Sequence, residues 1–218
     1  MILSEVLAFM RTRMARATSS TTITDDELIL ELRLAQNLYQ KKEILPWFIV
    51  KTPRKEWTLF EGYKALPVPN DFIRELDTDG VSLVCNTTVI PLLKGDYNVL
   101  VRRYGRNPGT PERYAIQGTY LYLFPYVLDT TAGFQVELNY YFKAEFPTEL
   151  DGTNEWLTDA PELLAEEAIA NYFEFTLLKK EDAQLHRARA SNLEQELRTA
   201  IIARDEANRV TTMGGYYA

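Results

Sequence analysis

The chain has 218 residues, 46% hydrophobic and 25% charged, which is enough for one folded domain that carries an insertion. Its net charge of −7, with 31 acidic against 24 basic residues, argues against tight binding to a nucleic-acid backbone. Its single cysteine excludes an intrachain disulfide, and neither a signal peptide nor a membrane-spanning run is recognisable, so no membrane partner is expected.

The first 45 residues predict two helices. Thr24 and Glu27 have the spacing of a capping box at the start of the second helix, which should end near Leu45 because Pro46 follows. The first helix should bury one apolar stripe, formed by Leu3, Val6, Leu7, Met10 and Met14. The second carries two apolar rows, which predict packing on two sides: Leu28, Leu32, Ala35 and Tyr39, and then Leu30, Leu34 and Leu38.

Residues 47–147 are rich in aromatic and β-branched residues, Gly and Pro, which predicts a β-rich insertion. We expect a short helix to begin at Asn70 or Asp71 and a hairpin connection at 129–133. Alternating aromatic and leucine residues over 120–124 indicate a strand that lies between two layers or presents one face to another protein. The expected strands are Trp57–Tyr63, Val81–Val89, Tyr97–Tyr104, Tyr114–Phe124 and Phe134–Phe146.

The last third predicts helix again, entered through a cap at Asp159 and Pro161 in the first turn. The absence of Gly and Pro over 162–213 allows either one helix of about 45 residues or two helices joined near 179–182. The predicted fold class is therefore α+β: a helical bundle, 1–45 and 155–208, with an inserted antiparallel β-rich subdomain. From this bundle, Leu32, Leu38, Leu164, Ala168 and Tyr172 should share one core.

Residues 209–218 differ from the helix before them and predict a flexible arm. Its candidate partner-binding residues are Met213, Gly214, Gly215, Tyr216 and Tyr217, since two glycines allow the arm to turn and two tyrosines provide large anchors. The alternative is a frayed terminus without a partner.

Residue types that support catalysis or metal binding are scarce. The single histidine, His186, is expected on an exposed helix face, and one His with one Cys cannot build a zinc site or support a triad. Glu166 and Glu167 are expected on a solvated helix face. We therefore predict no catalytic residue, no metal ligand and no cofactor, with a carboxylate-only active site as the disfavoured alternative.

Several segments, taken in order, resemble the head-to-tail adaptor proteins of tailed phages, also called head completion or gatekeeper proteins. Residues 66–72, Leu-Pro-Val-Pro-Asn-Asp-Phe, resemble the LPxDF step that follows an early strand containing a Trp, here Trp57. Tyr114–Gly118 followed by an aromatic strand resembles the strand pair in the middle of such domains. Leu138–Tyr141 resembles the strand that leaves the insertion, and Asn154–Leu157 the entry to the C-terminal helix.

The resemblance implies a structural virion protein of the neck, made in the host cytoplasm. It implies a homo-oligomeric ring of about twelve copies between the portal protein and the next tail or neck component, with DNA passing non-specifically through the channel. The alternatives are another neck or tail-completion subunit, a tube-end subunit, and a β-rich glycan-binding module on a helical stalk.

Overall fold

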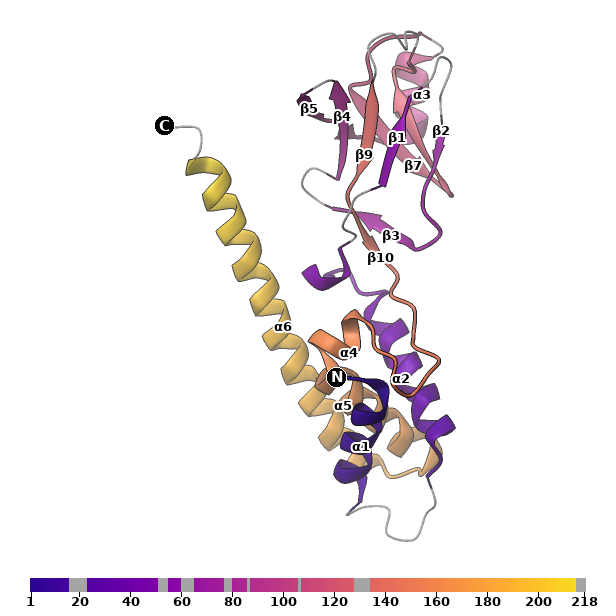
Figure 1. Ribbon diagram of the computed structural model, residues 1–218, viewed down its shortest axis with the longest axis vertical. Helices are drawn as coiled ribbons and strands as arrows, with labels where there is room; N and C mark the ends of the chain where they lie inside the picture. The colour runs from indigo at the N-terminus through magenta and orange to yellow at the C-terminus, as the bar shows by residue number, and fades with distance from the viewer. Residues whose placement is uncertain are drawn as a thin grey trace. The chain divides into compact units, whose positions relative to one another are not determined.

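The computed structural model describes residues 1–15, 23–50, 55–59, 65–76, 80–85, 87–105, 107–127 and 134–214, with side chains described up to residue 204. It confirms the α+β class, with a long C-terminal helix and antiparallel sheets (Figure 1). The chain divides into a helical unit, Met1–Ile49 with Ala144–Ala218, and a β-rich unit, Val50–Lys143.

Helix α5 (Pro161–Asn171) forms the centre of the helical unit. It packs against α1 (Leu3–Met14), α2 (Asp25–Tyr39), α4 (Glu155–Asp159) and α6 (Lys180–Gly214). Because neighbours surround α5, every residue from Leu163 to Ala170 is buried, as expected for a helix without a solvent face. The short 3₁₀ helix η1 (Trp47–Ile49) packs beside α4.

Local sequence signals place α1 and the start of α2 correctly, but α2 ends at Tyr39, well before the end predicted near Leu45. All five apolar residues of the predicted α1 stripe are buried. The Thr24 hydroxyl accepts from the Glu27 amide at 3.3 Å, and the Glu27 carboxylate accepts from the Thr24 amide at 3.0 Å. These reciprocal bonds satisfy amides that the first turn of a helix leaves without partners.

The prediction that α2 packs on two sides is wrong. Its first row faces α5 and is buried, but Leu30, Leu34 and Leu38 are 54%, 49% and 45% exposed. Leu38 therefore does not join the core with Leu32, Leu164, Ala168 and Tyr172, which are all buried. Helical spacing distinguishes the two rows but does not say how many of them a neighbour covers.

The helical region after Pro161 is two helices. A π-helical turn, η2 (Tyr172–Thr176), follows α5, and Leu178 then adopts a positive φ of 56°. A residue whose backbone is in this left-handed region ends a right-handed helix. The sequence does not mark the position with Gly or Pro. Helix α6 begins at Lys180 and continues to Gly214, beyond the Asn208 at which the sequence predicts its end.

The described residues of the β-rich unit form three small sheets. One has the order β1-β9-β4-β5, another β2-β8-β7-β6, and the third pairs β10 with β3. All pairs are antiparallel except β6 with β7. The strands are β1 (Lys55–Thr58), β2 (Ala65–Pro67), β3 (Phe72–Glu75), β4 (Val81–Cys85), β5 (Thr88–Pro91), β6 (Leu93–Lys94), β7 (Arg113–Gln117), β8 (Tyr120–Phe124), β9 (Gln135–Leu138) and β10 (Tyr140–Phe142).

Three local predictions in this unit are wrong. Tyr97–Tyr104 is a helix, α3, because the Asp96 carboxylate caps the Val99 amide at 3.0 Å and Leu100 is buried against the sheet. The short helix expected at Asn70 or Asp71 is instead strand β3, which β10 holds by backbone pairing. The hairpin connection expected at 129–133 lies outside the described residues, but β8 and β9 on either side of it belong to different sheets and do not pair as a hairpin.

Candidate functional site

The base of α6 is attached to the helical unit by a buried carboxylate. Glu166 on α5 is 2% exposed, and its Oε2 lies 2.6 Å from Nδ1 of His186 on α6. Arg13 on α1 and Arg189 on α6 approach the same carboxylate at 3.6 and 3.9 Å. Because a buried carboxylate without partners is strongly unfavourable, this cluster ties α1, α5 and α6 together.

The prediction that His186 is exposed is wrong, since the residue is only 4% exposed. It lies between Ala183 and Ala190 on the face of α6 that packs on α5, and these small residues let the two helices approach closely. The ring of Phe173 stacks on the imidazole, with centroids 5.5 Å apart. The many charged residues on the outer face of α6 made the whole helix look exposed in the sequence, so the buried face was not predicted.

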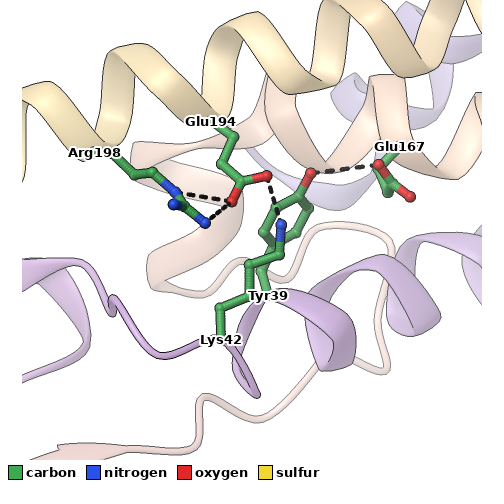
Figure 2. Close-up of polar contacts among 5 residues, drawn as sticks. All are labelled: Tyr39, Lys42, Glu167, Glu194 and Arg198. Atoms are coloured by element: carbon green, nitrogen blue, oxygen red, sulfur yellow. Dashed lines mark hydrogen bonds and ion pairs between the residues drawn. The ribbon is translucent and has the colours of Figure 1, made fainter.

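Glu167, also expected on a solvated face, is 8% exposed and belongs to a second contact (Figure 2). The Tyr39 hydroxyl on α2 donates to its carboxylate at 3.4 Å. Burial, followed by the charge of Glu167, raises the pKa of Tyr39 well above its usual range. Tyr39 therefore remains a neutral donor at any physiological pH and joins α2 to α5.

A third contact joins α6 to the residues after α2. Figure 2 shows the Glu194 carboxylate on α6 between Lys42, whose Nζ donates at 2.5 Å, and Arg198, whose nitrogens donate at 2.7 and 3.0 Å. Burial alone would raise the pKa of Glu194, but the hydrogen bonds from Lys42 and Arg198 outweigh it and lower that pKa. The carboxylate is therefore ionised and holds α6 against the end of α2.

Further along α6, Ile201 is buried and the Arg204 guanidinium lies 5.2 Å from the centroid of the Trp47 ring. Contacts along α6 from His186 to Arg204 thus attach it to the rest of the helical unit. The helix then continues to Gly214. Helix α6 is therefore a rod whose first part is fixed to the helical unit and whose C-terminal end is at Gly214. Such a helix is suited to attaching the protein to a partner.

The predicted arm lies at the end of this rod. Met213 and Gly214 belong to the last turn of α6, so that the backbone is helical where an arm beginning at 209 was expected. Gly215, Tyr216 and Tyr217 lie outside the described residues. Sequence reasoning missed the residues that fix α6 in the helical unit, namely His186, Glu166 and Glu194, because their partners come from distant parts of the chain.

The alternating strand β8 has two different faces. Leu121 and Leu123 are buried, whereas Tyr120 is 46% exposed and Tyr122 is half-buried. Helix α3 covers part of the aromatic face, with the rings of Tyr97 and Tyr122 4.7 Å apart. The strand therefore combines a covered leucine face with an aromatic face that is open in part.

Within the described part of the chain, no group of three or more His, Cys, Asp or Glu side chains is arranged to hold a metal ion. The helices described include none that is long and apolar enough to cross a bilayer.

A family model described as SU10 adaptor protein matches residues 1–215, almost the whole chain. A comparison with curated proteins finds no match. The family match confirms the resemblance to phage adaptor proteins that the sequence segments indicate.

Proposed function

Because the chain belongs to the SU10 adaptor protein family, a family of structural phage proteins, we propose that it forms the ring between portal and tail. About twelve copies surround the channel through which the DNA passes. The C-terminal end of α6 and the residues that follow it grip the portal protein. The β-rich unit meets the next tail or neck component.

The observation that supports this proposal is the attachment of α6. Contacts with three other segments of the helical unit, namely α5, the segment after α2 and η1, hold this helix at His186, Arg189, Glu194 and Arg204. A helix fixed in this way carries its own C-terminal end, at Gly214, at a constant distance from the core of the helical unit. Since the helix is already ordered, only the short segment beyond it loses entropy when it binds.

The charge distribution also supports a DNA channel. The helical unit holds 21 of the 31 acidic residues but only 13 of the 24 basic ones, so the excess of negative charge lies in this unit. A ring of such units repels the phosphate backbone, which lets DNA move through without sticking.

The decisive experiment is co-purification of the portal protein with the full chain and with a chain that ends at Val210. We expect the truncated chain to stay folded, because it keeps every contact of α6 that the structure describes, from His186 to Arg204, and to lose the portal. The matched variants are Tyr216→Ser with Tyr217→Ser, which should release the portal, and Tyr216→Phe with Tyr217→Phe, which keep the rings and should retain it.

Wild-type portal binding by the truncated chain would reject the arm as the grip. Recovery of a tail-tube component in place of the portal would instead favour a tail-completion or tube-end subunit. Binding to glycans with no affinity for either protein would favour the glycan-binding alternative.

A further inference from the structure

A pocket of about 200 Å³ opens on the aromatic face of the β-rich unit, between α3 and strand β8. Figure 1 shows α3 beside the sheet that contains β7. The walls are almost entirely aromatic or apolar, and we call this feature the aromatic pocket, defined by Tyr97, Val101, Tyr104, Tyr122, Phe124 and Tyr126.

The rings of the aromatic pocket are held in place by contacts with one another, and part of their surface remains exposed to solvent. Phe124 is buried and contacts Tyr97 and Tyr104, with ring centroids 6.0 and 6.4 Å apart. The four tyrosines are half-buried, and the Val101 side chain at the edge is 39% exposed. A pocket with fixed aromatic walls can accept one large apolar or aromatic side chain with little rearrangement.

Two arginines give the neighbourhood of the pocket a positive charge. The Arg103 guanidinium lies 5.5 Å from the centroid of the Tyr104 ring. Arg113 pairs in register with Phe124, so both side chains lie on the same face of the sheet. Neither arginine forms an ion pair with a carboxylate in the described part of the chain. Glu112, which accepts from the Tyr104 hydroxyl at 3.5 Å, offsets only one of the two charges.

We propose that the aromatic pocket receives an aromatic side chain flanked by carboxylates from an extended segment of the tail-side protein. The ring fills the pocket, and the flanking carboxylates pair with the guanidinium groups of Arg103 and Arg113, which form planar, bidentate contacts with carboxylates. This assignment rests on the proposed function for the identity of the partner. The aromatic and acidic character of the ligand follows from the aromatic pocket and the two arginines beside it.

A protein segment fits the site better than nucleic acid does. The β-rich unit holds 11 basic and 10 acidic residues, and Glu112 stands beside the pocket, so the unit lacks the concentrated basic surface that a continuous phosphate backbone requires. A peptide with an aromatic residue between two carboxylates, unlike a phosphate backbone, has negative charge only beside the two guanidinium groups. Its aromatic side chain also gains the desolvation typical of interface hot spots.

The first test measures binding of capped pentapeptides to the full chain by NMR titration, with tyrosine ring signals as the readout. The probe is Glu-Glu-Trp-Glu-Glu, and the controls are Lys-Lys-Trp-Lys-Lys, Glu-Glu-Ala-Glu-Glu and a thymidine octamer of single-stranded DNA. We expect only the acidic tryptophan peptide to bind saturably, with a Kd of about 0.1–1 mM. Equal binding of the lysine peptide, or tighter binding of the octamer, overturns the proposal.

Two valines on α3 provide a matched pair of variants. Val101→Glu places a carboxylate at the mouth of the pocket, whereas Val99→Glu adds the same charge to the same helix away from the pocket, at a residue 57% exposed. We expect Val101→Glu to weaken peptide binding at least about tenfold and Val99→Glu to change it less than about twofold. Equal losses in both variants mean that the charge on α3 matters and the pocket does not, and this result rejects the proposal.

A particle assay separates failure of this inference from failure of the proposed function. Particles assembled with Val101→Glu should retain portal binding but fail to attach tails, while Val99→Glu particles should attach them. If Val101→Glu particles attach tails normally, the pocket is not the tail-side contact. If the wild-type chain never binds a portal, the proposed function fails, but the peptide titration still decides what the pocket binds.

Discussion

His186 and Glu166 form a buried pair in which Nδ1 and Oε2 are 2.6 Å apart, and the pair joins the base of α6 to the centre of the helical unit. His186→Ala should lower the free energy of unfolding by about 2–3 kcal/mol, because it leaves a carboxylate that is 2% exposed with only the distant contacts to Arg13 and Arg189. Urea denaturation measures this loss. The double variant His186→Leu with Glu166→Leu should recover part of it, and equal or greater instability would contradict a charge effect.

Glu194 should make the stability of the helical unit depend on pH. Its pKa in the folded chain lies below the ordinary value of 4.5, so the folded state favours the ionised form. The stabilisation is complete above pH 4.5 and is lost as the pH falls through the lowered pKa. Glu194→Gln should therefore lower the denaturation midpoint at neutral pH, and the difference from wild type should shrink in acid.

The control for this measurement is Glu196→Gln on the outer face of α6, where the residue is exposed and has no ion pair among the described residues. This variant should leave the midpoint nearly unchanged at every pH. A difference between wild type and Glu194→Gln that stays constant from neutral pH to acid would contradict an ionic role for Glu194.

Leu178 should be more stable as glycine. Its positive φ of 56° disfavours any side chain with a Cβ, and its side chain is 77% exposed, so little packing is lost on removal. Leu178→Gly should raise the free energy of unfolding by about 0.5–1 kcal/mol. Leu185→Gly, at a residue 51% exposed inside α6, should lower it by about 1 kcal/mol. The opposite signs of the same exchange test the backbone conformation directly by thermal unfolding.

The two apolar rows of α2 should respond differently to truncation. Leu32→Ala removes a side chain from the core and should cost about 2–5 kcal/mol. Leu34→Ala removes one that is 49% exposed and should cost less than about 1 kcal/mol. Chemical denaturation of the two variants provides the comparison, and similar losses in both would mean that the row of Leu34 is covered in the folded chain.

Predictions from the sequence succeed here where the cause is local. The capping box at Thr24 and the buried stripe of α1 depend on residues within one or two turns, so spacing alone identifies them. The α+β class follows in the same way from the change of composition between the helical ends and residues 47–147.

The failures have a common physical origin in contacts between distant residues. Tyr97–Tyr104 has the β-branched and aromatic content of a strand, yet the Asp96 cap and the packing of Leu100 make it a helix. His186 is buried because α5 lies against it, and Leu38 is exposed because no described element covers it. For the candidate site, the sequence indicated the arm at Met213–Tyr217 but not the charged contacts that hold the helix before it.

The position of α5 in the chain sets an order of events during synthesis. Helices α1 and α2 leave the ribosome first, yet the helix against which they bury their apolar faces is made only after the whole β-rich unit. That unit is continuous, Val50–Lys143, so it can fold on emergence while the two N-terminal helices still expose Leu3, Leu28 and their neighbours. Chains that stall before α5 is complete, at Asn171, should therefore expose these apolar faces to aggregation or to chaperones.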